Sequence, residues 1–378
     1  MQMEDEMFED GLEEECYATA ILDAKYEPAT PEQIIEDSCS HLTSEQQQDL
    51  FGIFSSRSQL FDGKLRVFDG PKMNIELMEG AKPPWKRAYP VAHVHQETFR
   101  KELMHLCQIG VLSRCGESPF GAPTFVTPKK DGRVRVVSDM RELNKIIKPS
   151  NYTLPKITDT LRKHHGYQYF TKIDISMQYY TFELTDEAKN ICTITTPFGN
   201  FRYERAPMGL RNTPAFAQAR MEEVLRDIPE CDVYIDDIGI FTETWEHHVE
   251  VVEKVLTKLE EKGFAVNPLK CEWAVKETDW LGYWVTPEGL KPWSKKVEAI
   301  LNLAPPTNAY EIRHLVGMVN YYRDMWPRRT HMLAPFTALS SGPKKQKVEW
   351  TPELDVAFKQ FKLFKYSGAK LLIMLIST

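Results

Sequence analysis

The sequence lacks the patterns that mark a secreted, zinc-bound or membrane-spanning protein. Its 7 cysteines are scattered and odd in number, and no Cys-x-x-Cys pair occurs among them, which argues against a disulfide framework and a zinc knuckle. No N-terminal apolar run has the form of a signal peptide, and the one strongly apolar stretch, residues 371–376, is too short to cross a bilayer. We therefore expect a cytoplasmic, intracellular protein in a reducing compartment, with no membrane partner.

Basic residues are scarce at the N-terminus. Residues 1–40 contain 13 Asp/Glu and a single basic residue, Lys25, whereas the remaining residues contain 46 Lys/Arg against 41 Asp/Glu. The overall net charge of −7 therefore combines an acidic N-terminal segment with a mildly basic body. We expect residues 1–40 to be a mobile leader. The charge of the body is compatible with nucleic-acid binding and equally with an ordinary protein surface.

Helical periodicity recurs along the body of the chain. Thr43 or Ser44 is a candidate N-cap for a helix through residues 45–54. A second apolar face ends before Gly110, and a third helical stripe ends at Gly263. These helices alternate with β-forming segments, which predicts an α+β fold rather than a doubly wound parallel sheet.

One β-hairpin is indicated by its turn. Residues 122–128 and 133–137 are rich in β-forming residues and flank Asp131-Gly132, a strong short-range hairpin signal. The proline-containing segments 80–92 and 285–310 are expected to connect larger parts of the fold.

The tetrad Tyr234-Ile235-Asp236-Asp237 places two acids side by side between β-forming residues. This pattern predicts two strands joined by a tight turn, with both acids at its tip. A third acid, Asp174, stands near the end of a predicted strand at residues 167–175. If these strands are neighbours in one sheet, three carboxylates converge at its edge. Taken alone, each acid could equally be a solvated turn residue.

Three converging carboxylates would repel one another unless cations neutralise them. Hard oxygen ligands of this kind suit Mg²⁺, with Mn²⁺ as a substitute. Two such ions, about 3.5–4 Å apart, can clamp the attacking and leaving oxygens of an in-line phosphoryl displacement. The chemistry predicted is attack of a primer 3′-hydroxyl on the α-phosphate of a deoxynucleotide, with pyrophosphate leaving.

A series of blocks resembles, in the same order, the motifs of reverse transcriptases from gypsy-type LTR retrotransposons. The blocks are residues 124–132, 138–145, 170–174, 196–199, 206–215, 234–237, 280–283 and 317–326. The resemblance covers roughly residues 41–364 and implies a fragment of a Pol polyprotein. The implied activity is that of an RNA-directed DNA polymerase, a nucleotidyltransferase. The implied fold is a right hand of fingers, a palm with an antiparallel sheet, and a helical thumb with the start of a connection.

The resemblance also implies partners and residue roles. The partners would be an RNA or DNA template with its primer, deoxynucleoside triphosphates and other retroelement proteins, within a virus-like particle if the element is active. Asp174, Asp236 and Asp237 would hold two Mg²⁺ ions, with the carbonyl of Ile175 as a further ligand. Lys270 would act as a general acid toward the leaving pyrophosphate.

The implied nucleotide-binding residues are Lys129, Lys130, Arg135, Tyr179, Met208 and Gly209. Of these, Tyr179 matches the aromatic residue that excludes a 2′-hydroxyl, although a core tyrosine is the alternative. The implied nucleic-acid-binding residues are Trp280, Leu281, Gly282, Tyr283, Arg313, Gly317 and Tyr321. The last three are four residues apart and share one helical face, where tight helix–helix packing at Gly317 is the alternative.

The predicted organisation follows from these blocks. We expect a leader at 1–40, a helical N-terminal extension at 41–84, fingers and palm at 85–285, and thumb with the start of a connection at 286–364. Residues 365–378 no longer resemble the family, and we expect a frameshift near residue 364 that removes the RNase H. No Asp-Ser/Thr-Gly protease motif and no His-His-Cys-Cys integrase motif occurs.

One departure from the family lies beside the first catalytic acid. Gln178 replaces a Gly or Ala that packs close to the nucleotide, and the resemblance therefore predicts weakened catalysis. Three hypotheses remain open: an active polymerase, a truncated remnant that folds and binds nucleic acid without copying it, and a host-adopted interaction protein that acts through its acidic leader. Asp174, Asp236, Asp237 and Arg135 favour the first over the third, because a binding module has no use for metal-binding acids.

Overall fold

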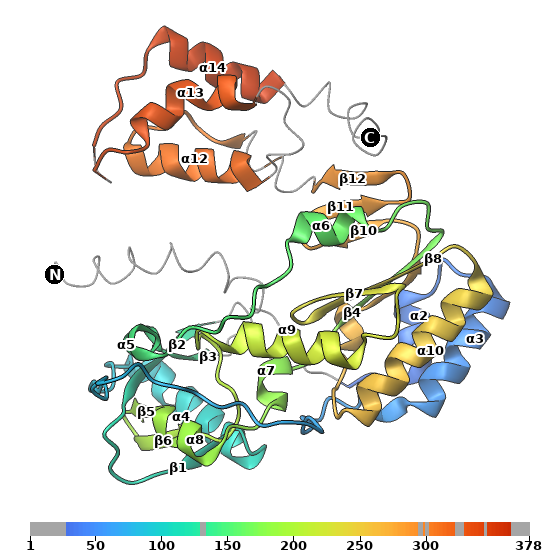
Figure 1. Cartoon of the computed structure of the whole chain (residues 1–378), viewed down its shortest axis with the longest axis horizontal. Coiled ribbons are helices and arrows are strands. Elements are labelled where there is room, and N and C mark those ends of the chain that lie inside the picture. The colour runs from blue at the N-terminus through green and yellow to red at the C-terminus, as the bar shows by residue number, and fades with distance from the viewer. Residues whose placement is uncertain are drawn as a thin grey trace. The chain divides into compact units, whose positions relative to one another are not determined.

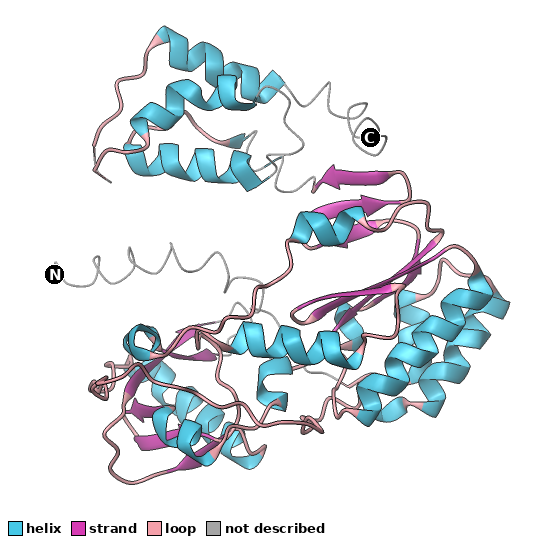
Figure 2. Ribbon diagram, in the orientation of Figure 1, coloured by secondary structure: helices cyan, strands magenta, loops and turns pink. Residues whose placement is uncertain are grey.

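The computed structural model describes residues 28–128, 134–293, 298, 302–321, 329–343 and 346–363. The chain divides into two compact units, Met1–Pro155 with Thr171–Ala274, and Lys156–Phe170 with Val275–Thr378 (Figure 1). Helices and strands alternate along both (Figure 2), so the α+β prediction is confirmed. The predicted leader up to residue 27 and the predicted frameshifted tail lie outside the described residues.

The first unit contains a five-stranded and a four-stranded sheet. Its helices are α2 (Pro31–Ser38), α3 (Ser44–Ser56), η2 (Ser58–Phe61), α4 (His93–Gln108), α5 (Arg141–Ile146), α7 (Gln178–Thr181), α8 (Asp186–Ile191), α9 (Thr213–Val224), α10 (Trp245–Glu261) and η3 (Pro268–Lys270). One sheet has the order β1-β6-β5-β2-β3, from β1 (Leu112–Arg114), β2 (Ala122–Pro128), β3 (Val134–Ser138), β5 (Thr193–Thr196) and β6 (Gly199–Tyr203). The other has the order β7-β8-β4-β9, from β4 (Tyr169–Asp174), β7 (Cys231–Tyr234), β8 (Asp237–Thr242) and β9 (Glu272–Val275).

The predicted secondary structure agrees well with these elements. The hairpin of β2 and β3 is antiparallel, with Thr127 opposite Arg135, and its turn at 129–133 lies outside the described residues. Helix α10 ends just before Gly263, as the sequence indicates. Gly263 has φ +73°, and a Cβ there would come within 2.0 Å of the Val67 carbonyl oxygen. Glycine is therefore required where the chain turns away from α10.

The N-terminal helices belong to the first unit. Thr43 caps α3 and shares a capping box with Gln46, which confirms the predicted helix start. Thr30 caps α2 in the same way, and Ile34 on α2 is buried. Part of the segment expected to be a mobile leader, residues 31–38, is thus a capped helix with a buried apolar residue.

The second unit contains one sheet and a small helical bundle. Its elements are α6 (Ile157–Arg162), β10 (Thr278–Trp280), β11 (Tyr283–Thr286), β12 (Gly289–Pro292), α12 (Ala309–Tyr321), α13 (Arg329–Leu339) and α14 (Pro352–Leu363). Ile312, Leu315 and Val319 of α12 pack with Phe336 and Phe358 in its core. Within the described ranges, no helix is long and apolar enough to cross a membrane.

A buried histidine joins α10 to the four-stranded sheet. Its ring nitrogens lie 2.8 Å from the hydroxyl oxygens of Thr171 on β4 and Thr242 on β8, and the side chain of His248 is fully buried. Burial lowers the pKa of His248 to about 3. The ring is therefore neutral at physiological pH and serves as a hydrogen-bonding link in the core.

This histidine should make stability depend on pH. Between about pH 6.5 and pH 3 the unfolded chain protonates His248 while the folded chain does not, so the free energy of unfolding should fall as the pH falls. A His248→Gln variant should be less stable at pH 7.5, but the gap to the parent should shrink by roughly 2 kcal/mol at pH 5. Urea denaturation of both proteins at the two pH values measures this gap. An equal gap at both values would contradict the assignment.

Candidate active site

The two adjacent acids lie at the turn of a β-hairpin, as predicted. Tyr234 at the end of β7 pairs with Asp237 at the start of β8, which leaves Ile235 and Asp236 as a two-residue turn. Ile235 has φ +57°, in the left-handed region. For a β-branched residue this conformation costs about 1–2 kcal/mol, so the surrounding structure must hold it.

Two glutamine side chains hold the peptide groups of Ile235. On α9, Gln218 accepts the Ile235 N–H at 2.6 Å through Oε1 and donates to the Val233 carbonyl at 2.9 Å through Nε2. On α7, Gln178 donates through Nε2 to the Ile235 carbonyl at 2.7 Å. Both α7 and α9 lie beside this hairpin (Figure 1). Both the N–H and the carbonyl of the strained residue Ile235 are thus held by hydrogen bonds.

Gln218 was not among the residues singled out from the sequence. Its signal is a polar residue on a buried helical face, because Gln218, Met221 and Leu225 follow one another at helical spacing and all three are buried. A buried amide in an apolar stripe needs partners, and here they are the Val233 carbonyl and Ile235 N–H of the hairpin, together with the carboxylate of Glu222.

Asp174 lies at the same sheet edge as the hairpin. Strand β4, which ends at Asp174, is the neighbour of β8 in the sheet. The next residue, Ile175, donates its N–H to the carbonyl of Asp236 at 2.9 Å. The arrangement of neighbouring strands on which the sequence prediction depended is therefore present.

The three acids influence one another electrostatically. Burial raises the pKa of Asp236 and of Asp237, and the negative charges of neighbouring acids raise both further. Burial also raises the pKa of Asp174, while the positive charge of Lys270 opposes the shift. Such a group of carboxylates is fully charged only if cations compensate it.

Lys270 reaches Asp174 from a distant part of the sequence. Asn267 donates its N–H to the Asp174 carbonyl at 2.9 Å, and the 3₁₀ turn η3 follows immediately. This turn brings the Lys270 ammonium to 3.5 Å from Oδ2 of Asp174. The lysine that the resemblance assigned to the site is thus beside its first acid.

The oxygen atoms available at this edge are of the type that binds a hard divalent ion. Carboxylate oxygens of Asp174, Asp236 and Asp237 with a backbone carbonyl are the ligands that Mg²⁺ takes. In the described part of the chain, however, no three His, Cys, Asp or Glu side chains are already gathered around one point. The acids are therefore neighbours at one edge rather than a closed cage.

Tyr179 lies on α7, directly after Gln178, and is buried. Burial and the negative charge of Asp236 raise the pKa of its hydroxyl, so the ring stays protonated. Met208 packs at the edge of the main core, and Gly209 follows it with φ +80°. These residues lie in the same unit as the three acids.

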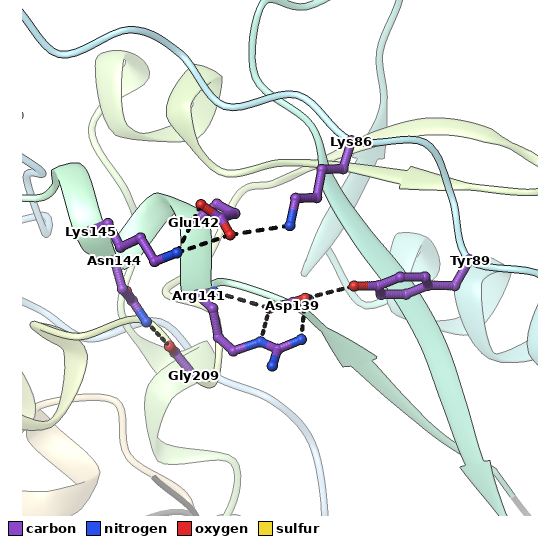
Figure 3. Close-up of polar contacts among 8 residues, drawn as sticks. All are labelled: Lys86, Tyr89, Asp139, Arg141, Glu142, Asn144, Lys145 and Gly209. Carbon is purple, nitrogen blue, oxygen red and sulfur yellow. Dashed lines mark hydrogen bonds and ion pairs between the residues drawn. The ribbon is translucent and has the colours of Figure 1, made fainter. Parts of the chain in front are cut away.

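A polar network ties the loop after Met208 to α5 (Figure 3). Asn144 donates to the Gly209 carbonyl at 2.9 Å and accepts the Arg211 N–H at 2.8 Å. At the start of α5, Arg141 and Tyr89 hold the carboxylate of Asp139 at 2.9 Å each. Burial alone would raise the pKa of Asp139, but these hydrogen bonds outweigh it and the pKa lies below its ordinary value. The block at 138–145 therefore has a structural role in shaping this loop.

The predicted residues of the β2–β3 hairpin are only partly placed. Lys129 and Lys130 lie outside the described residues. Arg135 lies on β3, opposite Thr127, and its backbone alone is described.

In the second unit, Trp280 and Tyr283 close the hairpin of β10 and β11. Both side chains are buried, and the turn residues Leu281 and Gly282 have φ +49° and +80°, as in a type I′ turn. The hydroxyl of Tyr321 donates to the Leu281 carbonyl at 3.0 Å, and its ring stacks on Tyr283 at 5.7 Å. The end of α12 is thus joined to this turn.

Arg313 and Gly317 differ in their surroundings. Arg313 donates to the carbonyls of Ser340 and Gly342, both at 2.8 Å, and so caps the end of α13. A Cβ at Gly317 would meet nothing within 4 Å. Tight helix packing, the alternative for Gly317, is therefore absent among the described residues, and Gly317 itself is exposed.

Comparison with known proteins gives a consistent set of relatives. Residues 127–285 match a family model described as reverse transcriptase (RNA-dependent DNA polymerase). The retrovirus-related Pol polyprotein from transposon 297 of Drosophila melanogaster is 33% identical over 333 residues, covering 85% of this chain and 31% of that protein. The transposon Tf2-3 polyprotein of Schizosaccharomyces pombe is 30% identical over 295 residues, covering 78% and 22%. The chain thus spans less than a third of the length of these relatives.

Solved structures share the fold. The foamy viral protease–reverse transcriptase in complex with double-stranded DNA has a TM-score of 0.80 at 24% identity, covering 89% of this chain and 71% of that one. The same enzyme in complex with an RNA/DNA hybrid has a TM-score of 0.78 at 24% identity, covering 88% and 45%. The predicted α+β fold is confirmed by this match.

Proposed function

The chain contains the reverse transcriptase domain of an LTR retrotransposon Pol polyprotein, and from this membership we propose that it copies RNA into DNA. The reaction would be addition of deoxynucleotides to a primer 3′-hydroxyl, with loss of pyrophosphate. The relatives are much longer than this chain, so other activities of the full polyprotein are not assigned to it.

The observation that carries this proposal is the shared edge of β4 and the β7–β8 hairpin. Three acids with raised pKa values lie along this edge, and a lysine contacts the first of them. Structural ion-pair networks also shift pKa values, but here the shifted groups coincide with the motif that the family model covers.

Asp174, Asp236 and Asp237, with the carbonyl of Ile175, would hold two Mg²⁺ ions, for which Mn²⁺ could substitute. When bound, the ions would polarise the transferred phosphate and the attacking hydroxyl. The chain's own contribution is to orient the acids through the held turn and to supply a proton from Lys270 to the leaving pyrophosphate. Tyr179 would pack against the sugar of the incoming nucleotide.

The remaining predicted residues would position the substrates. Lys129 or Lys130 and Arg135 would meet the nucleotide from the fingers, opposite Met208 and Gly209. The turn of Leu281 and Gly282, between Trp280 and Tyr283, would hold the primer end. On α12, Arg313, Gly317 and Tyr321 would follow the duplex. The open surface at Gly317 supports this role, because a nucleic-acid backbone could approach closely.

Primer extension by the full chain tests the proposal. We expect a DNA primer on an RNA template to be extended in Mg²⁺ and not in EDTA. Binding of the primer–template without extension would support the alternative, a retroelement remnant that folds and binds nucleic acid but does not copy it. If the chain neither binds nor extends the primer–template, both proposals fail.

A further inference from the structure

Gln178 lies at a position where the resemblance implies a small residue. Its side chain is 4% exposed, on the first turn of α7. The amide nitrogen donates to the carbonyl of Ile235 at 2.7 Å, whereas its Oε1 is buried and has no hydrogen-bond partner in the described part of the chain. The hydrogen bond from Nε2 to the Ile235 carbonyl therefore sets the orientation of the Gln178 side-chain amide.

The carbonyl that Gln178 holds belongs to the peptide bond between Ile235 and Asp236. Its orientation sets the direction in which the backbone enters Asp236. Gln218 holds the other side of Ile235 through the N–H, and Ile175 holds the next carbonyl, that of Asp236. Three backbone groups of the strained turn, the Ile235 N–H and the carbonyls of Ile235 and Asp236, are therefore each held by a separate contact.

We propose that Gln178 is a positioning residue that fixes the Ile235–Asp236 peptide and thereby the direction of the Asp236 carboxylate. This inference rests on the proposed function, because it assigns Asp236 to metal binding. It reverses the expectation drawn from the sequence, in which a large residue at 178 impairs catalysis. A Gly or Ala at this position would leave the partly buried carbonyl of Ile235 without its side-chain donor, which costs free energy.

The test uses the near-isosteric Gln178→Met variant of the full chain, which keeps the bulk and removes the donor. We expect kcat for primer extension to fall roughly tenfold, the ratio that one buried hydrogen bond typically carries, with the KM for deoxynucleotide changed less than about twofold. Mn²⁺ binding, followed by electron paramagnetic resonance, should weaken by a similar factor. Gln178→Gly should also lower the rate rather than raise it.

The matched control is Gln96→Met. Gln96 on α4 also donates through Nε2 to a backbone carbonyl, that of Val91, at 3.2 Å. Loss of this hydrogen bond should leave kcat and Mn²⁺ binding unchanged. Thermal unfolding of each variant separates local effects from global loss of structure. Unchanged kcat and Mn²⁺ binding in Gln178→Met, or a faster Gln178→Gly, would overturn the inference. If the parent binds Mn²⁺ but copies nothing, the proposed function fails, while the Mn²⁺ comparison still decides the role of Gln178. If the parent does neither, both proposals fail.

Discussion

Replacing Asp236 with asparagine is expected to lower the rate of primer extension by at least about a hundred-fold, because loss of one preorganised electrostatic contact in an active site typically costs on the order of 10²–10³ in rate. The substitution keeps the size of the side chain and removes its charge. The turn should persist, since Gln178, Gln218 and Ile175 hold its backbone and not the carboxylate. The measurement is single-turnover extension in saturating Mg²⁺.

Asp227→Asn supplies the matched control. Asp227 is an exposed acid of the same unit, paired with Lys258 at 2.9 Å, and exposed ion pairs contribute about 1 kcal/mol or less. Its extension rate should equal that of the parent. An Asp236→Asn protein that extends primers within a few-fold of the parent rate would exclude the assigned role of the hairpin.

Replacing Trp273 with alanine is expected to lower the free energy of unfolding by about 3–5 kcal/mol, as for other large-to-small changes in well-packed cores. Trp273 on β9 is completely buried and packs against Phe54 and Phe61, with ring centroids 4.6 Å and 6.3 Å away. Its carbonyl oxygen is also 3.1 Å from Nε2 of His41. The cost is large because this one side chain joins the N-terminal helices to the sheet that bears Asp174.

Urea denaturation measures the loss, and Trp85→Ala is the comparison. Trp85 is 51% exposed, so the same truncation removes much less buried surface and should cost clearly less. If the two variants lose equal stability, the N-terminal helices do not contribute to the core as inferred. Helix α3 would then belong to an attached extension, as the predicted segment at residues 41–84 supposed.

Local patterns predicted most of the elements that carry the site. The hairpin of Asp236 and Asp237 follows from alternating β-forming residues around a polar pair, and the cap at Thr43 follows from one side chain. The start of α2 was missed because the charge of residues 1–40 was averaged over the whole segment. The capping box of Thr30 and Gln33 was the overlooked signal.

The periodicity of the sequence did not predict contacts between segments that are far apart in the chain. The approach of Lys270 to Asp174 came from resemblance alone, since 96 residues separate them. The contact between Gln178 and Ile235 could not be anticipated, because it depends on how α7 packs against the hairpin. From the sequence, Gln178 at a position expected to hold a small residue predicted weakened catalysis; its hydrogen bond to the Ile235 carbonyl is visible only in the structure.

The held turn also bears on which residues position 235 can tolerate. Gln178 and Gln218 bind the carbonyl and the N–H of Ile235, groups that the main chain supplies whatever the side chain. The turn geometry is therefore nearly independent of sequence at its own tip. Valine or methionine should be accepted there with the acids unmoved, and proline should not, because it has no N–H to offer Gln218. Substitutions at residue 235 that keep its N–H should therefore leave Asp236 and Asp237 in place.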